Sequence, residues 1–226
     1  MKSPNKIFIL LFLIAVSQNN FSQTIGIKAG MNISKFDITN RYKENYSDRI
    51  VYRIGSQVGV TANFSISKVF SVETGVSLFS KGSNFTSGYF GNYQNDVSRI
   101  SLLYVNLPLY LKTSIPIGKA KIFVAFGPYI GYGFSGKTRS SYVTNSGMVK
   151  TGLSSVKWGK ENSGEFENLD YGASAGIGVE LKPIQINLFY DYGIANISTN
   201  SEYFEIKNRV IGLSVAYLFG KKNKAN

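Results

Sequence analysis

The chain has 226 residues, a formal net charge of +12 at pH 7, 43% hydrophobic residues and 17% charged residues. This length fits one domain, and the apolar and aromatic content excludes an intrinsically disordered protein. Cysteine and histidine are absent from the sequence, which excludes a disulfide framework, a cysteine-anchored lipoprotein and any site that needs an imidazole.

The N-terminal segment is predicted to be an export signal. Two lysines precede an apolar run over residues 7–16, which is far shorter than the roughly 20 residues of a membrane-spanning helix. Small residues place the cleavage site near residue 17 or 22, so the predicted signal peptide covers 1–22. An uncleaved anchor helix is the alternative.

Segment 24–34 is the first predicted strand. Apolar residues from Ile25 to Ile33 occupy its odd positions, and Gly, Lys, Asn or Ser occupies its even positions. Because successive side chains of a strand point to opposite faces, this alternation gives one apolar face and one polar face. The same pattern predicts seven more strands, over residues 52–64, 69–80, 100–113, 120–134, 170–182, 184–195 and 208–219.

The connections between these strands alternate in length. The short ones are 65–68, 114–119 and 182–183, whereas the long polar ones are 35–51, 81–99, 135–169 and 196–207. Outer-membrane barrels have short periplasmic turns, longer extracellular loops and an even number of strands. The sequence therefore predicts an all-β fold, an eight-stranded antiparallel up-and-down transmembrane β-barrel over 23–220, with both termini in the periplasm.

The positions of the glycines indicate which face of the strands lines the lumen. All glycines within the predicted strands fall on the polar face, which a solvent-exposed strand has no reason to prefer. A narrow lumen must combine small residues with large ones. The large residues on the same face are Tyr104, Tyr110, Phe123, Tyr129 and Phe189. The polar face is therefore predicted to point inward, and a soluble barrel or sandwich is the alternative.

The apolar face is then predicted to form a lipid-facing band. Aromatic residues gather at its two ends, as they do at membrane interfaces. The outer group is Tyr52, Tyr132, Phe134, Tyr171 and Tyr192, and the periplasmic group is Phe64, Phe70, Tyr217 and Phe219. Pro108 and Pro128 lack the N–H that a strand ladder uses, so each predicts a local irregularity.

Several charged residues share the inward phase, among them Arg53 and Asp191. Four residues at comparable heights in the periplasmic half predict a buried charge network, which closes the lumen or, alternatively, carries protons or solutes. They are Lys28, Glu73, Lys112 and Glu180. No nucleophile, cofactor motif or calcium loop accompanies them, so no catalytic, cofactor-binding or metal-ligating residue is assigned.

Three segments resemble the PorT-type outer-membrane β-barrel family of Bacteroidetes: Gly26–Ser34, Tyr104–Lys112 and Asp191–Ile197. The resemblance implies an eight-stranded barrel in the bacterial outer membrane. Some members of that family support type IX protein secretion, and many others have no assigned role. The resemblance therefore implies a fold and a location, and it transfers no mechanism.

Three functions remain open on the sequence alone: a structural or protein-interaction barrel, an accessory component of type IX secretion, and a small channel. The first would use its loops, above all 135–169, to contact envelope or secretion proteins. The residues considered there are Trp158, Lys157, Lys160, Glu161, Glu165 and Glu167. Outer-membrane lipid and lipopolysaccharide are predicted partners, with the basic tail 221–226 near the phosphate-rich surface. No nucleic-acid partner and no cofactor are predicted.

Overall fold

The computed structural model of the protein describes residues 23–40, 50–86, 97–143, 149–159 and 164–219. The predicted signal peptide (1–22) and basic tail (221–226) lie outside these ranges, and both stay predictions. Across the same ranges the structure holds no helix with the length and apolar character that crossing a membrane requires. The strands are β1 (Gln23–Asn40), β2 (Ile50–Val51), β3 (Arg53–Ser65), β4 (Phe70–Thr86), β5 (Val97–Ile117), β6 (Ala120–Val143), β7 (Val149–Ser155), β8 (Leu169–Leu181), β9 (Ile184–Gly193) and β10 (Phe204–Phe219).

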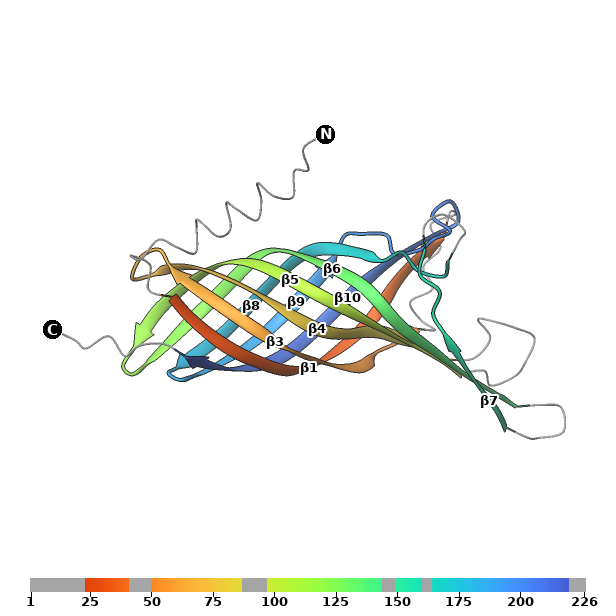
Figure 1. The fold of residues 1–226 in the computed structure, drawn as a ribbon, viewed down its shortest axis with the longest axis horizontal. Coiled ribbons are helices and arrows are strands. Elements are labelled where there is room, and N and C mark those ends of the chain that lie inside the picture. The colour runs from red at the N-terminus through yellow and green to blue at the C-terminus, as the bar shows by residue number, and fades with distance from the viewer. Residues whose placement is uncertain (1–22, 41–49, 87–96, 144–148, 160–163, 220–226) are drawn as a thin grey trace.

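Eight of these strands close into an antiparallel barrel. They pair in the order β4-β3-β1-β10-β9-β8-β6-β5, and the β4–β5 pair completes the ring. β2 pairs with the end of β4, and β7 pairs with β6. β1 begins and β10 ends at the short-turn end of the barrel, while β7 extends from the opposite, outer end (Figure 1). The predicted fold class is confirmed.

At the outer end, the strands run on into segments that were predicted as polar loops. β1 continues to Asn40, β4 to Thr86 and β6 to Val143, β10 begins at Phe204, and β7 lies inside the predicted loop 135–169. The loop bounds at 35–51, 81–99, 135–169 and 196–207 were therefore wrong.

The physical reason is a reversal of polarity along each strand. Within the barrel wall the inward side chains are mostly polar or small, and the outward ones are apolar and exposed, for example Ile27 and Val58. Towards the outer end the inward side chains become apolar and fully or nearly fully buried, namely Phe36, Ile38, Phe85, Ile100 and Leu102. Most of their outward neighbours are charged or hydroxyl-bearing, for example Lys35, Asp37 and Arg99. Apolar and polar residues alternate in both halves of each strand, but the apolar face is outward in the barrel wall and inward at the outer end. A sequence search for one continuous apolar face therefore misses the outer half.

The two prolines mark gaps in the ladders, as predicted. Pairing between β4 and β5 breaks around Pro108, where the hydroxyl of Thr74 donates to the Pro108 carbonyl at 2.7 Å. Pairing between β5 and β6 breaks beside Pro128. A third irregularity, a register shift between Leu103 and Tyr104, was not predicted. All three lie on or against β5.

The two aromatic groups lie outward at the ends of the apolar band, as predicted. Tyr132 and Tyr171 are about half exposed at the outer boundary. Tyr217 and Phe219 are equally exposed near the short turns, with ring centroids 5.1 Å apart. Aromatic side chains with one apolar and one wet end suit the two surfaces of a bilayer.

Glycines lie next to large inward-pointing aromatic rings, as the sequence predicts for a narrow lumen. A Cβ on Gly212 would lie 2.3 Å from Cζ of Phe189, and a Cβ on Gly178 would lie 2.4 Å from Cζ of Phe123. The Phe189 ring is itself fixed against Phe79, with the centroids 6.1 Å apart. Small residues therefore make room for rings that fill the lumen.

Gly212→Val is expected to lower the free energy of unfolding by about 1–3 kcal/mol, because the added atoms overpack a ring that cannot move aside. Urea unfolding in lipid vesicles, followed by the gel mobility of the folded barrel, measures this change. Gly152→Val is the matched control, since a Cβ on Gly152 meets no atom within 4 Å. An equal shift for both variants would contradict the packing explanation.

Candidate functional site

A buried charge cluster closes the lumen near the short turns. Nζ of Lys112 lies 3.2 Å from Oε2 of Glu73 and 3.5 Å from Oε2 of Glu180. It also donates to Oε1 of Gln185 at 2.6 Å, and Nε2 of Gln185 donates to Glu73 at 3.2 Å. The Phe123 ring covers the ammonium group, whose Nζ lies 4.0 Å from the ring centroid. The predicted network is confirmed for Glu73, Lys112 and Glu180.

Lys28 forms no ion pair within this cluster, although the charge of Glu73 acts on it, so the prediction holds for Lys28 only as a longer-range attraction. Its cross-strand neighbours are Gly59 and Ala216, which carry no charge, and the described residues give it no ion pair. It lines a cavity of ≈ 10 Å³ together with Asp191 and other side chains. A cavity of this size is too small for a solute larger than a water molecule.

A second buried ion pair, which sequence reasoning missed, lies farther towards the outer end. Nζ of Lys81 is 2.8 Å from Oδ2 of Asp170, and both side chains are fully buried. Asn208 donates to the same carboxylate oxygen at 3.0 Å. Three rings surround the ammonium group, with Nζ-to-centroid distances of 5.2 Å for Phe79, 5.1 Å for Tyr104 and 4.5 Å for Tyr129. Lys81 was assigned to a loop, although it continues the inward phase of β4.

An apolar cap fills the outer end of the barrel. The inward residues of the extended strands pack with Val156, Phe166 and Ile197 from the connections after β7 and β9. Trp158 packs edge-on against Tyr104, with the ring centroids 5.8 Å apart. It therefore lies against the cap, although the sequence placed it among residues that contact partners. Lys160 and Glu161 lie outside the described residues.

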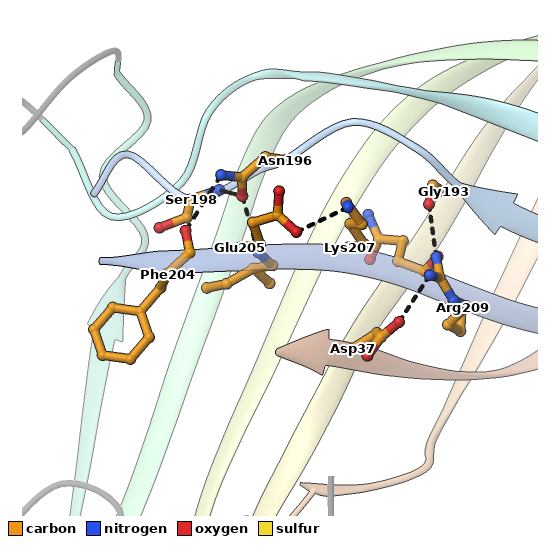
Figure 2. Close-up of polar contacts among 10 residues, drawn as sticks. Asp37, Gly193, Asn196, Ser198, Phe204, Glu205, Lys207 and Arg209 are labelled. Atoms are coloured by element: carbon orange, nitrogen blue, oxygen red, sulfur yellow. Dashed lines mark hydrogen bonds and ion pairs between the residues drawn. The ribbon is translucent and has the colours of Figure 1, made fainter. Parts of the chain in front are cut away.

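The outer surface of β1 and β10 carries charges that are paired. Nη2 of Arg209 lies 2.7 Å from Asp37, and its Nη1 donates to the carbonyl oxygen of Gly193 at 2.6 Å (Figure 2). Lys207 pairs with Glu205 at 3.0 Å. Figure 2 also shows Asn196, whose amide joins the connection after β9 to β10 through Ser198 and Phe204. Lys35, which lies opposite Arg209 on β1, is a further outward cation here, and its Nζ lies 5.2 Å from the centroid of the Tyr52 ring.

The outer surface of β3 to β6 differs from that of β1 and β10, because the Arg53 side chain contacts hydroxyl groups instead of a carboxylate. Arg53 was predicted to point inward, but its guanidinium donates to the hydroxyls of Ser80 at 3.1 Å and Ser101 at 2.8 Å. Both serines alternate with buried residues and so lie on the outward face. The inward assignment failed because the β3–β4 ladder ends at Gln57, which leaves Arg53 free to cross to the neighbouring strands.

Among the described residues, the interior of the barrel holds packed side chains and paired charges. The charged groups inside are paired or buried against rings, and at the small cavity Lys28 and Asp191 attract each other. No set of three or more metal-ligating side chains gathers within the described part of the chain. Among the described residues, the arrangement can hold the lumen shut and present an outer surface.

Comparison with known proteins supports the fold. A family model described as "Outer membrane protein beta-barrel domain" matches residues 17–199. No curated protein sequence matches the chain.

Among solved structures, OprG from Pseudomonas aeruginosa is similar at 12% identity and a TM-score of 0.44, covering 88% of this chain and 97% of that one. Neisserial surface protein A is similar at 10% identity and a TM-score of 0.42, covering 86% and 97%. Ail, the attachment invasion locus protein of Yersinia pestis, is similar at 11% identity and a TM-score of 0.40, covering 88% and 99%. Likenesses of this size carry no assignment of function.

Proposed function

Because this chain belongs to the outer membrane protein β-barrel domain family, we propose that it is a closed structural or protein-interaction barrel of the bacterial cell envelope, with no catalytic role. The family places the protein in the outer membrane, where lipid surrounds the apolar band. The proposal concerns what the barrel does there.

The filled lumen is the observation that carries the proposal. From the short turns outward, the lumen holds the Lys112 cluster, the Phe79–Phe189 ring pair, the Lys81–Asp170 pair and the apolar cap. Eight strands leave an interior that side chains can fill, and here they do. A closed barrel acts through its exterior and its loops, so interaction is favoured over transport.

The outer end offers a surface for such interaction. Every residue of β7 is exposed, and Val149 and Leu153 are exposed apolar residues. β7 pairs with β6 on one edge. A strand edge beyond the membrane can add a strand from a partner protein.

We expect the purified protein to show no unit conductance in planar bilayers, because its charged and apolar layers leave no continuous water path. Single-channel recording at symmetric salt measures this. A porin reconstituted in the same way is the positive control. Reproducible conductance steps from the folded protein would overturn the closed barrel in favour of the small channel.

The second candidate function is an accessory role in type IX secretion. The resemblance of segments 26–34, 104–112 and 191–197 to the PorT-type family supports it. The secreted and surface proteomes of a strain that lacks this gene, compared with the complemented strain, test it. Specific loss of exported cargo would support secretion, whereas an unchanged secretome with altered adhesion or envelope integrity would favour the structural barrel.

A further inference from the structure

We propose that Arg53, Arg99, Lys137 and Arg139 form a binding site for the phosphate groups of outer-leaflet lipopolysaccharide. We call these residues the basic cluster. The proposal requires that the barrel lie in the outer membrane, and it holds whether the protein serves envelope structure or secretion.

The strand register brings the basic cluster together on the outward face. Arg99 lies between Ser98 and Ile100, which are both buried, so its own exposed side chain points away from the lumen. Arg99 pairs directly with Arg139 across the β5–β6 ladder. The next outward pair is Ser101 with Lys137.

Arg53 completes the cluster from β3. Its guanidinium reaches Ser101, the cross-strand partner of Lys137, and Ser80 on β4. These two hydroxyls fix the orientation of a side chain that would otherwise be free. A planar guanidinium held in this way can present two parallel donors to a phosphate group.

The basic cluster lies at the depth of lipid headgroups. On β5 the outward residue Leu103 lies two positions from Ser101, which corresponds to about 7 Å along a strand. On β6 the exposed aromatics Tyr132 and Phe134 directly precede the basic residues. The reversal of polarity occurs at the same level, since Ile100 and Leu102 are buried inward. The cluster therefore begins where the apolar band ends.

The charge of the basic cluster is not balanced within the described residues. The ion pairs of the described residues all lie elsewhere, and two of them, at Arg209 and Lys207, lie on the opposite side of the same outer surface. Like charges placed directly opposite each other on adjacent strands destabilise a sheet. A bound anion removes this repulsion between Arg99 and Arg139. Phosphorylated glycolipid headgroups are the anions that a protein meets at this depth of the outer leaflet.

The test measures the affinity of the folded, detergent-exchanged full-length protein for lipopolysaccharide. The variant Arg99→Gln/Lys137→Gln/Arg139→Gln is expected to bind roughly 100-fold more weakly, since each basic residue near an anionic surface contributes about a fivefold factor. The matched control Lys68→Gln/Lys119→Gln/Lys182→Gln removes the same charge from exposed positions in the short turns at the other end of the barrel, and it is expected to stay within about twofold of the wild type.

The proposal would be overturned by equal loss of affinity in the two variants, by no loss in either, or by full affinity of the wild type for enzymatically dephosphorylated lipopolysaccharide. The last comparison needs no variant, so the proposal stays testable if a substitution impairs folding. Inorganic phosphate serves as the competitor. Displacement of the lipid at low millimolar phosphate would indicate a free-phosphate site instead, and it would also reject the lipid assignment.

Discussion

Lys112→Met is expected to lower the free energy of unfolding of the barrel by about 3–5 kcal/mol, the usual effect of removing one partner from a buried ion pair. The ammonium group lies between Glu73 and Glu180, all three being buried. Without it, two carboxylates face each other in a space that admits little water. Gln185 can donate to only part of the acceptors that Lys112 leaves behind.

Urea titration in lipid vesicles, with folded and unfolded protein separated by gel mobility, measures this loss. Lys207→Met is the matched control, because its pair with Glu205 is largely exposed and is expected to contribute under about 1 kcal/mol. Adding Glu73→Gln and Glu180→Gln to Lys112→Met should restore most of the stability. If the triple variant is no more stable than the single one, unpaired charge is not the cause of the loss.

Asp170→Ala is expected to cost about 3 kcal/mol or more, because it leaves the Lys81 ammonium group buried without an anion. It also leaves Asn208 without the acceptor of its 3.0 Å hydrogen bond. The rings of Phe79, Tyr104 and Tyr129 retain about 0.5–2 kcal/mol of attraction for the cation. We therefore expect a loss somewhat smaller than that of Lys112→Met.

The control is Asp37→Ala, which also removes an acidic partner from a cation. Arg209 keeps its hydrogen bond to Gly193 and its contact with the Tyr192 ring, with 3.8 Å between the guanidinium carbon and the ring centroid. We expect a loss of about 1 kcal/mol, because Asp37 is partly exposed and the buried Arg209 side chain keeps these other contacts. Losses of equal size at Asp37 and Asp170 would mean that burial of the inner pair contributes nothing.

The barrel wall was predictable because lipid imposes one rule on every strand. The outward residues of 24–34 and 211–219 must be apolar, and the period of two then fixes the strand and its inward face. Pro108 and Pro128 were predictable for an equally local reason, the missing N–H. Neither inference needs knowledge of what lies across the lumen.

The outer half was less predictable because water surrounds it. Phe36 and Ile38 occupy the same inward phase of β1 as Lys28. The rule that apolar residues point outward, which holds in the barrel wall, therefore assigns them to the wrong face. The Lys81–Asp170 pair joins residues on β4 and β8, which are not neighbours in the ring, and no local pattern reports such a pair. The lack of an ion pair between Lys28 and the Lys112 cluster has the same origin, since height along the barrel was known and angular position around it was not.

The reversal of polarity also bears on how the barrel is assembled. The outer strand ends must cross the bilayer with outward charges such as Lys35, Arg99 and Lys137, each costing about 2.5–3.5 kcal/mol in the hydrocarbon centre. On the outer side of the membrane, the inward apolar residues of these strand ends, Phe36 and Ile100 among them, pack together into the cap. This packing is available only after the strand ends have crossed. We therefore expect the crossing to be slow to begin. We also expect it to be hard to reverse, because the packed cap would have to come apart before the strand ends could return through the bilayer.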